Sequence, residues 1–487
     1  MKKLLTILSS LTITATSSVA VVACNQPKEE VVEYTPSEKK YPTSSTYQSS
    51  RTELVDEATI IDGIKKDAEH KKDSGNVSVY FLKRNAAFGG VQSLLSIANT
   101  LQDGGEVYYS LSQNIAPGDA NGEDSIAYHK LTRKYASKFH FQITNNNSTY
   151  IVDEDLQGIF TAVGDKKVDL YLEDFQLFDA ADRDVSIVEQ LLPYMPKINT
   201  ITITTDGTAQ LDFERRSQVW LSSIPEDYKT YLTQVWSDLI AGKTPTIDSK
   251  YYFDLDKILP TLTLKNVKQE KFANAWAASA RIYVDSLEQP YTWNQVSTGL
   301  ASAFSRLTEE NQKLFKEIYG IDNVTLSAGD YIIHTGNLIK DNHVTLLNVE
   351  AENVKATHEA NPNKKIIYKP HPREDSQYYE QLITKIAGFV EEDVEEVKEW
   401  FSIARAQTPI EVFALTGVYR SSEDKNFEYS VTATSTTVLG LYEADAKDDI
   451  VKYVFADAAQ ENHLRAMYGA SNDGVIDWRK SNLTASV

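Results

Sequence analysis

Apolar and polar residues alternate along this chain in a pattern that predicts strands followed by helices. Short apolar runs of the kind found in buried strands occur at residues 77–82, 107–109, 139–143, 168–172 and 198–204. Segments with apolar residues at helical spacing lie between them, at residues 91–101, 126–138 and 185–192. Such alternation is typical of a parallel sheet that carries helices on both faces.

A second alternating block follows a long segment, residues 214–327, that reads mostly as helical. In this block we expect a strand at residues 331–336, a helix at 346–358, a strand at 366–368 and a helix at 377–387. The two blocks predict an α/β protein with two Rossmann-like domains that face a central cleft.

The net charge of the chain limits the kinds of molecule that it is expected to bind. The chain has a formal net charge of -20 and a pI near 4.9, which argues against a nucleic-acid partner because phosphate backbones require a basic surface. The acidic run at residues 390–397 has valines at helical spacing, and we interpret it as the exposed face of a helix. None of the 8 histidines has the spacing of paired metal ligands, so we expect no metal.

The N-terminus has the pattern of a bacterial export signal. Met1-Lys2-Lys3 is a charged start, residues 4–22 are apolar, and Val21-Val22-Ala23-Cys24 resembles a lipobox, whose cysteine is lipidated and becomes the first mature residue. An uncleaved membrane anchor is the alternative explanation. Cys24 is the single cysteine, so lipidation leaves no thiol for disulfides, catalysis or zinc. We expect a protein on the outer face of the cell membrane, anchored through Cys24.

At 487 residues the chain has room for several parts. We expect, in order, a lipoprotein signal peptide at 1–24, a tether and lead-in helix at 25–74, a first Rossmann-like domain at 75–255, a second at 256–455, and a helical tail at 456–487 that packs back on the first domain.

Two candidate functional residues follow predicted strands. His371 lies between two prolines just after the strand at residues 366–368, and prolines end a strand because they cannot donate to its ladder. Asp206 follows the last strand of the first block. Ligands of open α/β sheets bind at the carboxyl ends of strands, so His371, beside Lys369 and Arg373, is placed to meet a phosphate. Taken alone, each segment is more often an ordinary surface turn.

Several short segments extend this pattern along the chain. The stronger ones are Thr205-Asp206-Gly207-Thr208, residues 368–373, residues 410–417 and Thr434-Ser435-Thr436; the weaker ones are Tyr291-Thr292-Trp293 and residues 307–312. In order and spacing this set resembles the bacterial sialyltransferases of glycosyltransferase family 80, over about residues 75–460.

The resemblance implies an inverting, metal-independent transferase of the GT-B type, which moves sialic acid from CMP-sialic acid to a galactose-type acceptor and needs no cofactor. It places the general base at Asp206 in the first, acceptor-side domain. In the second, donor-side domain it assigns His371 to the donor phosphate, as a catalytic and binding residue. The remaining assignments are Glu411 for the ribose, Ser435 and Thr436 for the phosphate, and Trp293 for stacking on the acceptor sugar. A carboxylate can accept a proton and fixed donors can stabilise a leaving phosphate, as these roles require. We expect a monomer whose partners are a nucleotide sugar and a glycan.

Two positions depart from the family. Gln113 stands where the family has an arginine, and Glu173 falls near a family histidine; both positions face the donor sugar or the acceptor. These departures leave activity uncertain. Two alternatives therefore stay open: a catalytically altered lipoprotein of the same fold that binds glycan or nucleotide, and a solute-binding lipoprotein.

Overall fold

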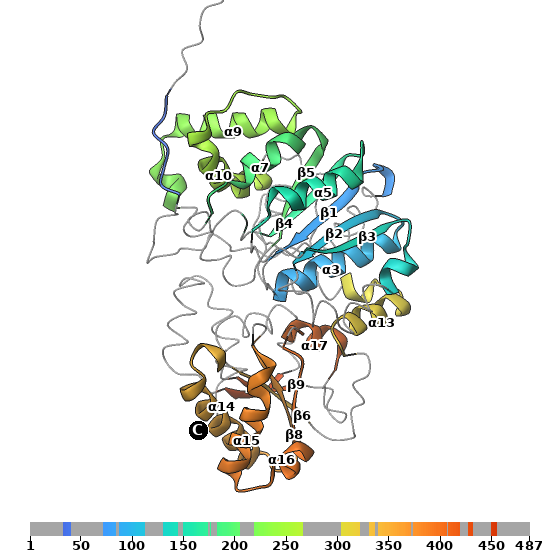
Figure 1. Ribbon diagram of the computed structural model, residues 1–487, viewed down its shortest axis with the longest axis vertical. Helices are drawn as coiled ribbons and strands as arrows, with labels where there is room; N and C mark the ends of the chain where they lie inside the picture. Colours follow the sequence, from blue (N-terminus) through green and yellow to red (C-terminus); the bar gives the residue numbers. More distant parts are fainter. Residues whose placement is uncertain are drawn as a thin grey trace, which may run out of the picture. The chain divides into compact units, whose positions relative to one another are not determined.

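The structure is a computed structural model, and it describes the greater part of the two predicted domains (Figure 1). The described residues are 33–39, 72–83, 87–112, 130–144, 150–173, 176, 183–204, 219–265, 303–321, 331–336, 339–371, 374–406, 408–418, 427–431 and 450–454. By its contacts the chain divides into Met1–Ser37 and Glu38–Val487. Residues 33–37 of the first unit form neither helix nor strand. Among the helices described, none has the length and apolar character needed to cross a membrane.

The first domain contains a parallel sheet of five strands, as the apolar runs predict. Its strands are β1 Val77–Leu82, β2 Glu106–Ser112, β3 Phe139–Thr144, β4 Val168–Glu173 and β5 Ile198–Thr204. Every neighbouring pair is parallel, and the order across the sheet is β3-β2-β1-β4-β5. Strands β1 and β4 are buried along their whole length, because central strands of a covered sheet are shielded on both faces.

Helices connect and flank these strands. They are α3 Ala87–Gln102, α5 Asp153–Val163, α7 Ile187–Leu191, η2 Leu192–Lys197, α9 Glu226–Ile240, η3 Ser249–Tyr251, α10 Tyr252–Lys265 and, further along the chain, α13 Glu309–Ile318. In α5 the buried apolar residues Leu156, Ile159, Phe160 and Val163 recur at helical spacing, so one stripe of the helix is apolar and packs inward. Helix α10 runs through the boundary that we expected between residues 255 and 256.

The second domain repeats the arrangement. Its strands are β6 Tyr331–Thr335, β7 Lys365–Lys369, β8 Phe401–Ile403, β9 Phe427–Val431 and β10 Ile450–Val454, all parallel to their neighbours, in the order β10-β9-β6-β7-β8. Counted from its own first strand, this order is the same as in the first sheet. The α/β class and the two parallel sheets are therefore confirmed.

Helices α14 His343–Ala360, α15 Tyr379–Val390, α16 Val394–Trp400 and α17 Ile410–Thr416 belong to the second domain, together with η5 Ile339–Asp341 and η6 Ser376–Tyr378. Buried side chains of β6, β7, α14 and α15 form one core cluster, which includes Ile332, Ile366, Val354 and Leu382. Burial of each such aliphatic side chain contributes roughly 1.5–3 kcal/mol to the stability of the domain.

The acidic run at residues 390–397 is not the face of one continuous helix. Helix α15 ends at Val390, and Glu391 adopts the left-handed conformation with φ of 60°. A new helix begins after Asp393, whose backbone N–H donates to Glu396 Oε2 at 2.9 Å. This local capping interaction competes with helix continuation, which the spacing of the valines did not reveal.

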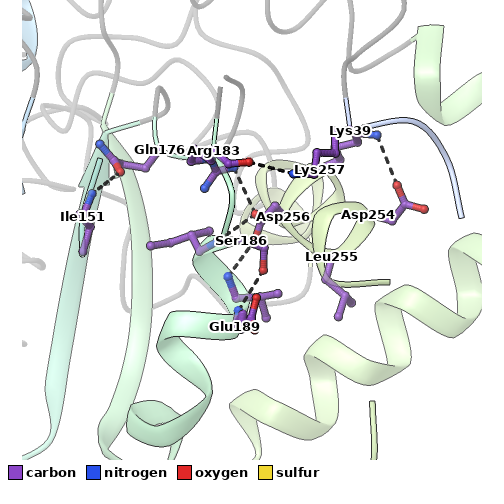
Figure 2. A network of polar contacts seen from close by, with 12 residues as sticks. Lys39, Ile151, Gln176, Arg183, Ser186, Glu189, Asp254, Leu255, Asp256 and Lys257 are labelled. Carbon is purple, nitrogen blue, oxygen red and sulfur yellow. Dashed lines mark hydrogen bonds and ion pairs between the residues drawn. The ribbon is translucent and has the colours of Figure 1, made fainter. Parts of the chain in front are cut away.

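A buried carboxylate joins α10 to α7 in the first domain (Figure 2). Asp256 Oδ2 lies 3.2 Å from Arg183 Nη2, and the carboxylate accepts the backbone N–H groups of Ile187 at 3.0 Å and Val188 at 2.8 Å. Burial raises the pKa of Asp256 to about 6, although Arg183 and the two N–H groups act in the opposite direction. The desolvation of the charged carboxylate therefore outweighs its partners.

This pKa predicts how stability depends on pH. Between the ordinary aspartate pKa of 3.8 and the folded value of about 6, the folded protein retains a proton on Asp256 that the unfolded chain has lost. The stabilising contribution of this group is thus complete below pH 4 and is lost as the pH rises through 6. Asp256→Asn cannot titrate at this position. In denaturant unfolding, we expect its stability relative to that of the unsubstituted protein to increase by up to about 3 kcal/mol between pH 4 and pH 7.

The exposed Asp248, whose pKa is lowered by the backbone N–H of Lys250, provides the control. Asp248→Asn should leave the slope between pH 4 and pH 7 unchanged. A relative loss of stability in Asp256→Asn over this range would show that attraction to Arg183 outweighs the cost of burial.

Candidate functional site

The carboxyl end of β7 places His371 where the sequence pattern predicts it. The strand ends at Lys369, and His371 follows after Pro370 with its side chain partly exposed. The backbone carbonyl of His371 accepts the N–H of Glu374 at 2.8 Å, which closes a tight turn. His371 is therefore held at the carboxyl edge of the second sheet, after the strand next to the central strand β6. In open α/β sheets ligands bind at this kind of edge.

Lys369 does not face solvent beside His371. Its side chain is buried, and its ammonium group donates to the carbonyl oxygens of Pro370 and, at 2.8 Å, of Ala406. The lysine thus ties the end of β7 to the segment that follows β8. Of the two cations expected beside His371, Lys369 is engaged in these internal contacts, and Arg373 lies outside the described residues.

Glu374 is a second buried charge at this edge, and the sequence offered no signal for it. Its carboxylate accepts the backbone N–H of Ile339, at the start of η5, and that of Asp375 at 2.9 Å. Burial raises the pKa of Glu374, while these backbone donors oppose the shift. Because η5 follows β6, Glu374 links the loop after β6 to the turn that contains His371.

Beneath this edge lies a fully buried polar network. His334 of β6 has its Nε2 atom 3.4 Å from Glu350 Oε2 of α14, and its ring lies 5.7 Å from the ring of Tyr368 of β7 in a stacked arrangement. Burial, and then the Glu350 carboxylate, raises the pKa of Tyr368 well above the usual tyrosine value. The signal for this network is a polar residue within an apolar strand or helix pattern, and hydrophobic spacing alone does not single out such residues.

Gly336 allows Tyr368 to reach the edge of the sheet. Its N–H donates to the Lys369 carbonyl at 3.0 Å, which extends the pairing of β6 and β7 by one step. A Cβ atom at position 336 would overlap the hydroxyl and ring of Tyr368. Since Tyr368 is fully buried, its ring has no room to move away.

The other predicted site residues are described less completely. Glu411 is the second residue of α17, which begins after Pro409, but its side chain lies outside the described part. The predicted residues Cys24, Gln113, Asp206, Trp293, Ser435 and Thr436 lie outside the described residues altogether. Within the described part of the chain, no three His, Cys, Asp or Glu side chains gather as a metal centre would require.

The corresponding edge of the first sheet contains a buried charge cluster. Lys83, immediately after β1, lies with its ammonium group 2.9 Å from Asp155 Oδ2 and 3.2 Å from Thr144 Oγ1. Glu173, the last residue of β4, accepts the backbone N–H of Lys83 at 2.8 Å through Oε2. Lys83, Asp155 and Glu173 are all buried. Glu173 therefore joins the ends of β1 and β4, a role that the family resemblance did not predict.

Comparison with known proteins adds no family. No protein-family model matches the chain, and no curated protein matches it. Among solved structures it is similar to tyrosyl-tRNA synthetase of Leishmania major bound to tyrosinol, at 8% identity and a TM-score of 0.19, over 81% of this chain and 98% of that one. The same enzyme bound to fisetin gives 10% identity and a TM-score of 0.20, over 89% and 80%. Scores this low support no argument about fold or function.

The packing of Gly336 against Tyr368 can be tested by stability measurements. Gly336→Ala should lower the free energy of unfolding by at least 1–3 kcal/mol, roughly the cost of overpacking a core, because the new methyl group displaces a buried ring. Gly388→Ala is the matched control: it lies in α15, has no atom within 4 Å of the added Cβ, and should be neutral or stabilising by up to about 1 kcal/mol.

A double variant checks the cause. Combining Gly336→Ala with Tyr368→Phe removes the hydroxyl group nearest the new methyl group, so part of the lost stability should return. Equal stability of the two alanine variants would contradict the close packing described here.

Proposed function

We propose that the protein is a glycosyltransferase of the GT-B type, an inverting sialyltransferase that transfers sialic acid from CMP-sialic acid to a galactose-type hydroxyl. The observation that carries the proposal is the position of His371 at the carboxyl end of β7, in a parallel sheet of Rossmann-like order. The ordered segments that resemble family 80 sialyltransferases give this position its proposed ligand, the phosphate of a cytidine nucleotide.

Further features of the second domain support a nucleotide donor there. Glu411 lies in the first turn of α17, where a carboxylate can accept hydrogen bonds from the ribose hydroxyls. Ser435 and Thr436 come soon after the end of β9, the strand on the other side of β6 from β7. In this proposal the His371, Ser435 and Thr436 side chains donate to the phosphate as negative charge grows on the leaving nucleotide.

The proposed acceptor side belongs to the first domain. Asp206 comes two positions after the last residue of β5, and in the proposed mechanism its carboxylate takes the proton from the acceptor hydroxyl as that oxygen attacks the sialic acid. The proposed site is the cleft between the two domains, with Trp293 stacked on the acceptor sugar. The reaction needs neither a metal nor a cofactor.

One observation favours a second candidate, a protein of this fold that binds a nucleotide or glycan without transferring a sugar. Glu173 is buried and uses Oε2 to bind the Lys83 N–H, although the resemblance assigns this region to contacts with sugar. A residue engaged in joining two strands is less available to a substrate. The binding function is therefore the outcome to expect if turnover is absent.

A direct assay tests the proposal. We expect the purified protein, incubated with CMP-sialic acid and lactose, to release CMP and to form sialylated lactose. Asp206→Ala should lower kcat by about 10²–10⁴-fold, as for loss of a general base, and leave CMP affinity unchanged. His371→Ala should weaken CMP binding about tenfold or more in calorimetry, since it removes a hydrogen bond to a charged group.

His358→Asn is the control for His371→Ala. His358 lies in the last turn of α14, stacked on Trp400, and the proposal gives it no ligand. Binding of CMP without turnover would favour the second candidate, whereas absence of both would refute the transferase and a nucleotide-binding role. Loss of CMP binding in Asp206→Ala together with normal binding in His371→Ala would reverse the assigned roles.

We also propose that the protein is anchored to the outer face of the membrane by lipid on Cys24. Cys24→Ser should abolish incorporation of labelled fatty acid and move the protein from the membrane fraction to the soluble fraction, provided that the apolar run is cleaved. Mass spectrometry of the mature N-terminus distinguishes lipidation from an uncleaved anchor, which would leave the Ser variant in the membrane.

A further inference from the structure

The lead-in segment is the stretch expected as tether and lead-in helix at residues 25–74. Two of its residues, Glu38 and Lys39, are bound to the first domain by hydrogen bonds that span large sequence distances. Lys39 Nζ donates to the carbonyl oxygen of Arg183 at 3.0 Å, and Lys257 Nζ donates to the carbonyl oxygen of Glu38. These bonds join positions 144 and 219 residues apart. Of these two adjacent residues, Lys39 thus donates one hydrogen bond and Glu38 accepts the other.

The receiving side is an ordered set of buried charges (Figure 2). The Lys257 side chain has no exposed surface, and its ammonium group lies 3.3 Å from Asp254 Oδ1. The other oxygen of Asp254 accepts the hydroxyl of Tyr228 at 2.7 Å. Burial lowers the pKa of Lys257, and the neighbouring Asp254 opposes this shift. The bonded partners of the ammonium group therefore offset part of the cost of its burial.

The carbonyl of Glu38 is one of those partners. A buried ammonium group has three donors, and each donor left without an acceptor costs about 1–3 kcal/mol or more. The domain thus buries a lysine whose hydrogen bonding is completed by the lead-in. Around Lys39, the Phe253 ring lies 4.4 Å from its ammonium group, and Arg183, which supplies the acceptor carbonyl, is held by Asp256.

We propose that Glu38 and Lys39 form a docking clasp, which fixes the lead-in on the α10 side of the first domain and makes it part of the folded unit. The tether expected from the sequence then ends at Glu38, where the first domain holds the chain. The stretch from Cys24 to Glu38 spans at most about 50 Å when fully extended, at ~3.6 Å per residue. If Cys24 is lipidated, as proposed above, this length limits the distance of the clasp from the membrane surface.

Digestion by a Glu-specific protease tests the clasp in the full chain, because cleavage requires local release of the backbone at Glu38. We expect slow cleavage after Glu38 in the unsubstituted protein. Lys39→Ala should accelerate it about tenfold, as expected for loss of one charged hydrogen bond. Lys72→Ala, which removes an exposed lysine of the lead-in, is the matched control and should leave the rate unchanged.

A second variant removes the receiving side. Lys257→Met alone would leave Asp254 buried without its cation and risks unfolding, so it is combined with Asp254→Asn. The double variant should also release Glu38 to the protease, with an unchanged circular dichroism spectrum. If neither Lys39→Ala nor the double variant changed the rate of cleavage after Glu38, the clasp would be overturned.

The membrane consequence has a separate readout. When the lipidated protein is bound to phosphatidylcholine vesicles, mass spectrometry of the digest should show faster appearance of a new N-terminus at position 39 for the two clasp variants. Failure of the protein to bind vesicles would refute lipidation but leave the clasp intact. Equal rates of cleavage after Glu38 in every vesicle-bound variant would refute the clasp itself.

Discussion

The fold depends on one constraint: every strand in both sheets runs parallel to its neighbours. The carboxyl ends of five strands therefore meet at one edge of each sheet, and the segments after them converge there. The first strand of each sheet is central, and later strands are added on both sides of it. At this strand, the segments that follow neighbouring strands therefore lead to opposite sides of the sheet. Residues that are distant in sequence, such as Lys83 and Glu173, or Glu374 and Ile339, become neighbours only for this reason.

Both edges hold buried charges, and the structure satisfies them with specific partners. The ammonium group of Lys83 pairs with Asp155, while the carboxylate of Glu374 accepts backbone N–H groups. Such pairs are costly to desolvate, and removal of one member leaves the other charge buried. They therefore add little net stability, but they restrict the arrangements that these loops can adopt. The same reasoning applies to Lys257, whose partners include the carbonyl of Glu38.

The two sheets differ in how their edges suit the proposed chemistry. In the second sheet, Lys369 and Glu374 hold the turn so that His371 stays partly exposed at the edge. In the first, Lys83 and Glu173 are buried and bound to the ends of strands. The second sheet thus leaves one side chain partly exposed at its edge, whereas the described part of the first edge is engaged in internal contacts. This contrast motivates the proposal that the second domain, and not the described edge of the first, holds the donor phosphate.

Apolar periodicity by itself determined the five strands of the first sheet, β6 and β7 of the second, and the position of His371 after β7, because strand burial and the effect of proline on pairing are local properties. It also placed Asp206 after the last strand of the first sheet, whereas the spacing did not predict the helix α17 that contains Glu411. It did not predict β8, β9 and β10. Tertiary structure alone decided that Lys369 binds carbonyl groups, that Glu173 joins β1 to β4, and that His334 and Glu350 meet in the core. It also decided that α15 and α16 are separate and that Lys39 reaches Arg183. Hydrogen bonds of polar side chains depend on which distant segments pack together. Hydrophobic spacing does not encode these contacts.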